Sequence, residues 1–352
     1  LETDCRFFVE AEKASEMAID TCVLEQKDYI VGMRRYFHAH PEVSLKEFKT
    51  SARIEEELDK VGIEHTRVGE TGVYARVVGK KPVEGKAKIV ALRADMDALG
   101  MDDLKNCEYS SQNPGFCHAC GHDGHTATLL AAARILKSME NDFAGEVRFF
   151  FQQAEEIGQG ARQFVAAGLL EGVDRIYGQH VTNTLNVGQV GIVAGPLNAS
   201  CDFFRIDVKG KGAHVSMPHK GVDALYVASQ IVVAVQSIVA RSTDPMESAV
   251  VGIGKAWAGT QYNIVAEEAV LEGTVRTFLP EVREATNRRL TDIVEKTAEM
   301  LGANASIVIK NYSNPLINDA DATKEAKLVA QEIVGAENIV TDYPKSMMAE
   351  DF

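Results

Sequence analysis

The sequence has few of the features that mark specialised protein classes. Among its 352 residues there are 9 Pro, 6 Cys and one Trp, and aromatic residues make up only 7% of the chain. Charged residues at 25% and apolar residues at 45% are ordinary values for globular proteins, which excludes disordered and collagen-like chains. At about 100–200 residues per domain, this length predicts two domains with their own cores.

Positive charge is also scarce. Lys and Arg total 37 against 51 Asp and Glu, which gives a net charge of −14. Nucleic acids and anionic membranes bind basic surfaces, so we expect neither as a partner. The longest apolar stretch, residues 225–240, contains Gln230, Gln236 and Ser237. It is too short and too polar for a membrane span, so we expect a buried helix there.

The N-terminal segment, LETDCRFFVE, is acidic and lacks the basic-then-apolar layout of a signal peptide. The six cysteines are scattered along the chain, which is typical of thiols or ligands and not of a disulfide framework. We therefore expect a soluble cytoplasmic protein.

Helical and strand patterns alternate along the first half of the chain. Ser44-Leu-Lys-Glu47 has the spacing of a capping box, at the start of a helix that Gly62 ends. We expect helices at 126–139 and 161–170 and strands at 73–78, 88–93, 147–152 and 175–181. Some of these strands are apolar on both faces, which favours a largely parallel sheet between helices and hence the α/β class.

The pattern changes after Gly195-Pro196. We expect strands at 203–208, 249–256, 269–278 and 306–310 and helices at 222–241 and 281–301. This β-α-β-β-α-β order is that of a ferredoxin-like unit. A linker at 311–318 and a helix at 322–334 follow. The predicted organisation is a catalytic domain formed by 1–198 and 312–352, with an inserted α+β lid domain at 199–311.

The densest cluster of metal-binding residue types is Phe116-Cys-His-Ala-Cys-Gly-His-Asp-Gly-His125. Zinc-like ions prefer thiolate and imidazole, and Cys120 and His122 can converge on one side of an extended loop. A redox pair of Cys117 and Cys120, a structural zinc knot that adds His122 and His125, and packing histidines are the alternatives. For His125, which enters the expected helix, capping or packing is favoured over ligation.

Further polar residues follow predicted strands. Glu155 and Glu156 come after an apolar strand, and His180 ends another. Open α/β sheets place their sites at the carboxyl ends of strands. One carboxylate of a Glu pair can hold a metal while the other moves a proton, although solvated strand ends and core histidines are common. Asp95-Met-Asp97 either supports such a site or forms an ion pair with Arg93.

The inserted domain offers three polar candidates. Gly210-Lys-Gly-Ala-His214 is a glycine-rich turn that either presents an imidazole to a cleft or simply connects two elements. Asn263 precedes the strand that ends near Arg276. The guanidinium of Arg276 suits a substrate carboxylate because it binds carboxylates through two parallel hydrogen bonds; a surface ion pair is the alternative.

These segments together resemble the M20 family of metallopeptidases, in its amidohydrolase branch. That branch includes N-acyl-amino-acid amidohydrolases, hippurate hydrolases and plant auxin-conjugate hydrolases. The match runs in order from about residue 30 to the end and includes Arg34-Arg-Tyr-Phe-His38-Ala-His-Pro41-Glu, Leu92-Arg-Ala-Asp-Met-Asp-Ala98, Asn113-Pro-Gly-Phe-Cys-His-Ala-Cys-Gly-His-Asp-Gly-His125, Phe151-Gln-Gln-Ala-Glu-Glu156, Gly210-Lys-Gly-Ala-His214, Gly273-Thr-Val-Arg276 and Glu350-Asp-Phe352.

The resemblance implies a zinc-peptidase-like α/β catalytic domain with a ferredoxin-like lid. It implies four ligands of a two-metal centre, which are Cys120, His122, Glu156 and His180. The ions would be zinc or manganese, with cobalt and nickel as further candidates. Glu155 would be the general base and acid, and His214 would stabilise the oxyanion, in many relatives from the partner subunit of a dimer. Asn263 and Arg276 would hold the substrate, and His38 would not be a ligand.

The expected activity is metal-dependent hydrolysis of the amide bond in N-acyl amino acids or related small conjugates. The substrate would be a small molecule with a carboxylate, and the enzyme a homodimer or higher homo-oligomer. A dipeptidase or carboxypeptidase of the same family is one alternative. The other is a metal-binding protein without catalysis, because the family carries a last histidine ligand beyond Glu350-Asp-Phe352 that this sequence does not include.

Overall fold

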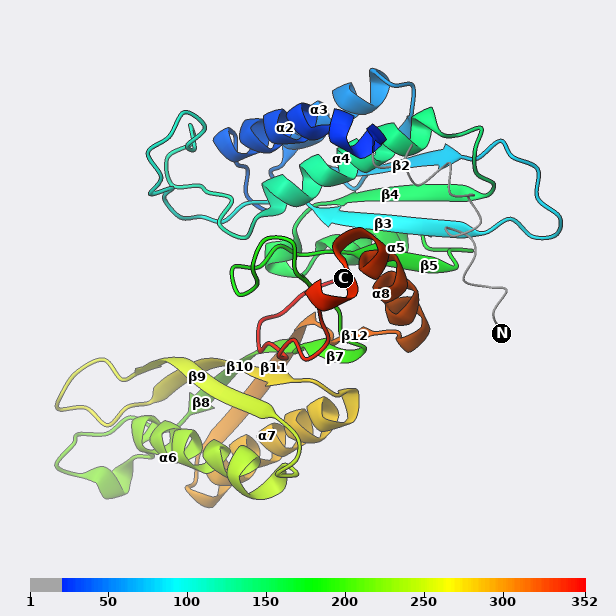
Figure 1. Ribbon diagram of the computed structural model, residues 1–352. Helices are drawn as coiled ribbons and strands as arrows, with labels where there is room; N and C mark the ends of the chain where they lie inside the picture. Colours follow the sequence, from blue (N-terminus) through cyan, green and yellow to red (C-terminus); the bar gives the residue numbers. More distant parts are fainter. Residues whose placement is uncertain (1–20) are drawn as a thin grey trace. The chain divides into compact units, whose positions relative to one another are not determined.

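The computed structural model describes residues 21–352, so the acidic segment 1–10 lies outside the described residues. The chain divides into two compact units (Figure 1). One runs from the first described residues to Val190 and includes Leu328–Val334 and Phe352, and the other comprises Gly191–Lys327 and Gly335–Asp351. The predicted insertion at 199–311 lies within the second unit, and its boundaries stay a prediction.

A five-stranded mixed sheet in the order β1-β2-β4-β3-β5 forms the centre of the first unit. Its strands are β1 (Glu64–Val68), β2 (Gly72–Val78), β3 (Ile89–Asp95), β4 (Glu146–Gln152) and β5 (Arg175–Gly178). β3 pairs in parallel with β4 and β5, whereas β1 and β2 pair antiparallel with each other and β2 with β4. The predicted α/β class is confirmed, and its sheet is mixed because a hairpin occupies one edge.

Helices cover both faces of this sheet (Figure 1). They are α2 (Lys27–Ala39), α3 (Phe48–Asp59) and α4 (His122–Ser138) on one face and α5 (Gly160–Ala166) on the other. Along β4, Phe149 and Phe151 are buried in the core beneath the three helices, while Phe150 packs against Phe164 of α5. Alternate side chains thus enter two cores, which is why this strand is apolar on both faces. The sequence patterns did not predict α2 or β1.

The predicted capping box at Ser44-Leu-Lys-Glu47 is wrong. Glu47 does occupy the position before α3, but its side chain does not cap the helix. The Ser44 hydroxyl instead donates a hydrogen bond to Asp97 at 2.6 Å. The buried carboxylate of Glu47 accepts hydrogen bonds from the hydroxyl of Thr71 at 2.8 Å and from the N–H of Ala154 at 2.9 Å. Both side chains therefore bond to residues distant in the sequence and not to the end of α3.

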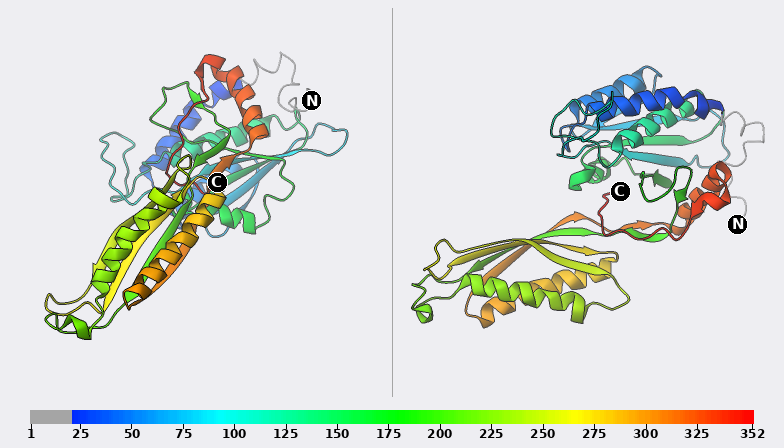
Figure 2. Two further views of the ribbon diagram at one scale, coloured as in Figure 1. Left: turned by 90° about the horizontal axis from the view of Figure 1, so that it is seen from below. Right: turned by 60° about the vertical axis from the view of Figure 1, so that its left-hand side comes forward.

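The second unit contains a four-stranded antiparallel sheet in the order β11-β8-β10-β9. Its strands are β8 (Cys201–Lys209), β9 (Ala249–Ala258), β10 (Glu268–Thr277) and β11 (Asn304–Ser313). Helices α6 (Ala224–Ser237) and α7 (Pro280–Met300) lie side by side on one face (Figure 2). The order along the chain is the predicted ferredoxin-like β-α-β-β-α-β.

Helix α6 continues as a π-helical turn, η4 (Ile238–Ser242), and this changes one expectation. The continuous stretch Ala224–Ser242 is long and apolar enough to cross a membrane by length and composition alone, so the expectation that it is too short and too polar is wrong. A single such helix is weak support for a membrane span. Val227, Ile231 and Val235 are buried in the core of this unit, but only 33% of the apolar window is buried, so the helix is less buried than expected.

Residues 311–318 are largely strand and not the predicted linker. β11 extends to Ser313, and β12 (Leu316–Asn318) pairs with β7 (Gly195–Asn198). The expected helix that follows is α8 (Ala320–Val334). The remaining short elements are β6 (Val190–Gly191), β13 (Ile339–Val340) and the 3-10 turns η2 (Glu155–Ile157), η3 (Pro218–Lys220) and η5 (Ala336–Asn338).

Candidate metal centre

Cys120 and His122 lie at the start of α4, which begins four residues before its predicted position. Gly121 between them has a φ of +92°, in the left-handed region that favours glycine. A Cβ on Gly121 would lie 2.4 Å from Cγ2 of Val181. Both the turn and this close approach therefore require glycine. His122 is buried and Cys120 is partly exposed.

The Glu pair lies in η2, directly after β4. The preceding Ala154 has a φ of +54°, which turns the chain sharply at the end of the strand. The carboxylate of Asp97 accepts hydrogen bonds from the backbone N–H of Glu155 at 3.2 Å and of Glu156 at 3.1 Å. Asp97 therefore fixes the turn that carries both side chains.

His180 follows β5, and a neighbouring carbonyl orients its ring. Nδ1 lies 2.6 Å from the carbonyl oxygen of Val181. Because a carbonyl only accepts, Nδ1 carries the proton and the neutral ring has its lone pair on Nε2. Nε2 lies 3.3 Å from Sγ of Cys120.

The structure brings five of the sequence-predicted residues together in two overlapping groups. The first group is Cys120, His122 and His180, and the second is His122, Glu155 and Glu156. In each group the donor atoms lie within 4.8 Å of one another. His122 belongs to both, so the two groups are adjacent and their donors suit divalent metal ions.

Two buried carboxylates give this cluster a negative environment. Oδ1 of Asp97 lies 3.3 Å from Nδ1 of His122, and Oδ2 of Asp95 lies 3.7 Å from Nε2. Burial disfavours the imidazolium, but Asp95 and Asp97 raise the pKa of His122 well above its usual value. Neither ring nitrogen of His122 makes a hydrogen bond of acceptable geometry with the described residues. The two buried carboxylates therefore favour a cation at this site, where the His122 nitrogens form no good hydrogen bond with described residues.

Burial also disfavours the charged forms of the other candidate ligands. Burial raises the pKa of the Cys120 thiol and of the Glu156 carboxyl, and lowers the pKa of His180. A divalent ion stabilises the thiolate and the carboxylate and binds the neutral imidazole. A donor set of sulfur, nitrogen and carboxylate oxygen suits zinc and similar ions, so the residues present fit the metals implied by the sequence.

His125 shares a third group with Asp95 and His122, but none with Cys120. Its Nδ1 lies 2.6 Å from Asp95, and its Nε2 accepts a hydrogen bond from the N–H of Val181 at 2.9 Å. Sequence reasoning missed this link, which connects β3 to the segment carrying His180. The one available signal was its position three residues after His122, on the same side of α4.

Two alternatives based on Cys117 are not formed among the described residues. Cys117 and Cys120 are both free thiols, so no redox pair is closed. Cys117 shares a group with His38 and Asp103, whereas Cys120 shares one with His122. The structural zinc knot is therefore wrong. The predicted ion pair of Arg93 is present, with Nη1 at 2.8 Å from Asp95 (side chains at the end of β3).

His214 and Asn263 lie close together in the second unit. His214 and Ile264 form a backbone bridge, and the N–H of Val215 donates to the carbonyl of Asn263 at 3.0 Å. Nδ1 of His214 accepts a hydrogen bond from the N–H of Ser216 at 3.2 Å, so the neutral ring carries its proton on Nε2. That exposed N–H can donate to a developing negative charge.

Arg276 lies at the other end of the same sheet. In the β8–β10 ladder, Glu268 pairs with Lys209 and Val275 pairs with Asp202. These two pairs are seven residues apart along the strand, or about 23 Å. His214 lies beyond the Glu268–Lys209 pair, and so still further from Arg276. The guanidinium of Arg276 donates to the carbonyl of Met347 at 2.9 Å. The lid of one copy therefore does not bring Arg276 to His214.

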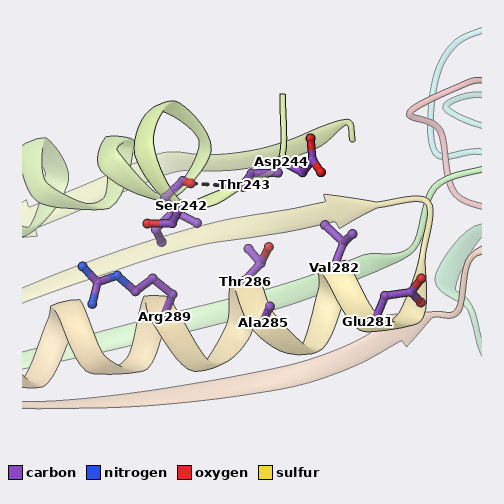
Figure 3. A pocket seen from close by; sticks show the side chains of 9 residues that line it. Ser242, Thr243, Asp244, Glu281, Val282, Ala285, Thr286 and Arg289 are labelled. Carbon is purple, nitrogen blue, oxygen red and sulfur yellow. Dashed lines mark hydrogen bonds between the residues drawn. The ribbon is translucent and has the colours of Figure 1, made fainter. Parts of the chain in front are cut away.

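A pocket of about 170 Å³ lies in the second unit between η4 and α7 (Figure 3). Ser242 and Asp244 line one side, and Thr286 and Arg289 of α7 line the other. None of the sequence-predicted site residues lines it, so it is separate from the candidate centre.

Comparison with known proteins agrees with this geometry. The family model described as peptidase family M20/M25/M40 matches residues 91–352. An N-acyl-L-amino acid amidohydrolase of Geobacillus stearothermophilus is 41% identical over 302 residues, which are 85% of this chain and 80% of that protein. The IAA-amino acid hydrolase ILR1-like 4 of Arabidopsis thaliana is 38% identical over 92% of this chain and 74% of its own length.

A solved structure shares the fold. The Bacillus subtilis YXEP protein, described as a dinuclear metal binding peptidase from the M20 family, superposes with a TM-score of 0.79. It is 35% identical, and the match covers 92% of this chain and 83% of that one. With its α/β unit, its separate antiparallel lid sheet and its clustered metal-ligand residues, this chain is a member of the M20 family of metallo-amidohydrolases and peptidases.

Proposed function

We propose that this chain hydrolyses the amide bond of N-acyl amino acids or related small amino-acid conjugates. The adjacency of the Cys120–His122–His180 group to Glu155 and Glu156 is the observation that carries the proposal. Cys120, His122, Glu156 and His180 would hold two divalent ions, zinc or manganese, with cobalt and nickel as substitutes. When bound, these ions supply positive charge that polarises the scissile carbonyl and acidifies water.

Glu155 acts as the general base and then the general acid. Its side chain belongs to the donor group around His122, and its backbone is fixed by Asp97. A carboxylate held there takes a proton from the attacking water and returns it to the leaving amine. Glu156 is the second carboxylate of the pair and stays a ligand, so the two roles fall to adjacent residues.

The lid residues bind the substrate. Nε2–H of His214 donates to the developing oxyanion, and Asn263 lies beside it. Arg276 holds the substrate carboxylate with the N–H groups that do not contact Met347. Because His214 and Arg276 lie at opposite ends of one lid sheet, we propose that a second copy supplies one of them, and hence that the active enzyme is a homodimer or a higher homo-oligomer.

The state of the cysteines is what supports a proposal for the compartment. The cysteines within the described residues, including Cys120, are all free. A thiol ligand of this kind is preserved in a reducing environment, so we propose that the protein acts in the cytoplasm.

The test compares Glu155→Gln with Glu156→Gln. In the full chain loaded with zinc or manganese, we expect Glu155→Gln to lower kcat on N-acyl amino acids by about 10²–10⁴-fold while the metal content stays that of the unaltered chain. Glu156→Gln should lower the metal content as well. Elemental mass spectrometry measures the metal, and amine release measures turnover.

Two further measurements make the result specific. Glu84→Gln, an exposed glutamate of the same unit, is the matched control and should change neither quantity. A substrate panel contains N-acetyl amino acids, indole-acetyl amino acids and dipeptides. Unchanged turnover in Glu155→Gln would contradict its role, and activity on dipeptides alone would replace the proposed substrate class by that of a peptidase.

A further inference from the structure

The first unit contains a second group of metal-ligand side chains outside the catalytic cluster. His38 lies near the end of α2, and Asp103 and Cys117 lie in the loop 96–121 between β3 and α4. Their donor atoms all lie within 4.8 Å of one another. We propose that these three side chains bind a zinc ion that fastens the loop to α2, with water as the fourth ligand.

The distance between two of the donors suits tetrahedral zinc. Nε2 of His38 lies 3.4 Å from Oδ2 of Asp103. Nitrogen and oxygen ligands at about 2.0–2.1 Å from a tetrahedral zinc ion lie about 3.3–3.4 Å from each other. The two donors therefore need little movement to share an ion. The side chains of His38 and Asp103 are only 1% and 3% exposed, and Cys117 is 4% exposed.

A carboxylate orients the imidazole for binding. Nδ1 of His38 lies 2.7 Å from Oδ2 of Asp123, which also accepts from the guanidinium of Arg34 at 2.9 Å. Asp123 is an ion-pair partner and therefore an acceptor, so Nδ1 carries the proton. The lone pair of the neutral ring is then on Nε2, which faces Asp103. Histidine ligands of metals usually have such a carboxylate partner on the other nitrogen.

The charges balance in this buried place. The backbone N–H groups of Ser111 and Lys105 donate to Asp103 at 2.9 and 3.0 Å and hold the pKa of its carboxyl at about 2. When the bond from sulfur to zinc forms, the thiol proton of Cys117 leaves to solvent. Zinc, one thiolate, one carboxylate and a neutral imidazole then sum to no net charge, which keeps the cost of burial low.

Lys105 marks the position that the ion would take. Its Nζ lies 3.4 Å from Nε2 of His38 and 3.6 Å from Oδ1 of Asp103. The lysine side chain is 49% exposed, so it can turn into solvent when zinc binds. The alternative is that this ammonium is the final cation of a plain ion-pair network. In that case Cys117 is a neutral thiol whose pKa is raised by burial and by Asp103, and it binds no metal. The two explanations therefore differ in whether loss of the thiol removes zinc.

The loop has reason to be fastened. Residues 96–121 contain no helix or regular strand, and loops beyond about 15 residues without such structure usually have a specific role. Leu99 and Cys117 exchange two backbone hydrogen bonds of 3.0 Å, and the N–H of Gln112 donates to the carbonyl of Ala39 in α2. The loop leads directly to Cys120, so a tie at Cys117 holds the entry to the catalytic cluster.

The test measures zinc in Cys117→Ser, which replaces the thiol by a hydroxyl of similar shape. We expect the full chain, dialysed against trace zinc, to lose about one zinc per chain in this variant and in Asp103→Asn. Cys107→Ser removes an exposed thiol from the same loop and should leave the count unchanged. Equal zinc in Cys117→Ser and the unaltered chain, with both folded by circular dichroism, would overturn the proposal.

Cobalt gives a second measurement that does not depend on the catalytic metals. In a Cys120→Ser chain, the catalytic thiolate is gone, so near-ultraviolet absorption from a thiolate–cobalt bond must come from another cysteine. We expect this absorption to persist in Cys120→Ser and to disappear when Cys117→Ser is added. If Cys120→Ser already lacks it, the site at Cys117 is wrong, whatever the outcome for the proposed amidohydrolase.

Discussion

Tyr29 in α2 carries a buried hydroxyl beside the Glu57 carboxylate. The oxygen makes no hydrogen bond of acceptable geometry with described residues, while the ring lies 4.3 Å from the guanidinium carbon of Arg134. Burial, and then the nearby Glu57 carboxylate, raise the pKa of Tyr29 far above its ordinary value of 10.0. The folded protein therefore keeps this phenol protonated at a pH where the unfolded chain ionises it. The contribution of this protonated phenol to the free energy of unfolding is fully present below pH 10 and is lost as the pH rises further.

We expect Tyr29→Phe to leave the free energy of unfolding at about pH 7 unchanged or to raise it by about 1 kcal/mol, because no good hydrogen bond is lost. Above about pH 10 the unaltered protein should lose stability that the variant keeps, so the difference should widen. Urea unfolding at both pH values measures it. Tyr262→Phe, at a side chain that is 95% exposed, is the control and should show no widening. A variant less stable at neutral pH would mean that the hydroxyl is bonded.

For single residues, the sequence indicates which side chains can bind a metal, but it does not show which hydrogen-bond partner a side chain has in the fold. Residue types alone left Cys120 and His122 open to a redox pair or a zinc knot; the resemblance to the M20 family is what joined them with His180 in one centre, and metal chemistry restricts which donors such a centre uses. The partners of Ser44 and Glu47 could not be predicted, because any nearby Asp or N–H would satisfy them as well as a helix end. Their partners, Asp97 and Ala154, lie 53 and 107 residues further along the chain.

Helix α4 is the element on which the candidate site depends most. Its first turn carries His122, and Cys120 lies just before it. Sequence patterns placed the start four residues late because Gly121 and Gly124 suggest a loop. Gly121 is indeed outside the helix, with its φ of +92°, but Gly124 lies within it. The two glycines therefore make a matched pair for an experiment.

We expect Gly121→Ala to be strongly destabilising and to weaken metal binding. An alanine there would have an unfavourable φ, which costs on the order of 1–2 kcal/mol, and its Cβ would press on Val181 beside His180. Gly124→Ala meets nothing within 4 Å and should instead stabilise by up to about 1 kcal/mol. Thermal unfolding and metal competition against a chelator measure both effects. Similar behaviour of the two variants would show that the left-handed turn is not what places the ligands.

Strand direction is what the sequence could not supply at this scale. The apolar run of β4 correctly predicted burial on both faces, because Phe149 and Phe150 enter different cores. Burial on both faces is common in parallel sheets but does not fix the direction of every neighbour. β2 pairs antiparallel with β4 through a full ladder, from Val73 opposite Phe151 to Val78 opposite Glu146. This antiparallel pairing comes from the hairpin of β1 and β2. The sequence did not predict β1, because that strand is mostly exposed and has no apolar run.

The molecule as a whole consists of two units with separate cores and separate chemistry. The five clustered residues, from Cys120 to His180, all lie in the first unit, as do His38, Asp103 and Cys117. The second unit contributes His214, Asn263 and Arg276 and has its own core around Phe204 and Ile231. Ions that bind the first unit should therefore stabilise that unit in particular.

Metal removal tests this division by hydrogen exchange. A ligand at a hundredfold excess over its Kd stabilises the state that binds it by about 2.7 kcal/mol, or about a hundredfold in an opening equilibrium. We expect chelation to speed exchange by up to that factor in the start of α4, in η2 and in the segment around His180. Exchange in β8 and β10 should stay the same, because their hydrogen bonds lie in a sheet that holds no candidate ligand. Equal acceleration in both sheets would mean that the two units open as a single cooperative body, and the lid would then sense the metal state of the catalytic unit.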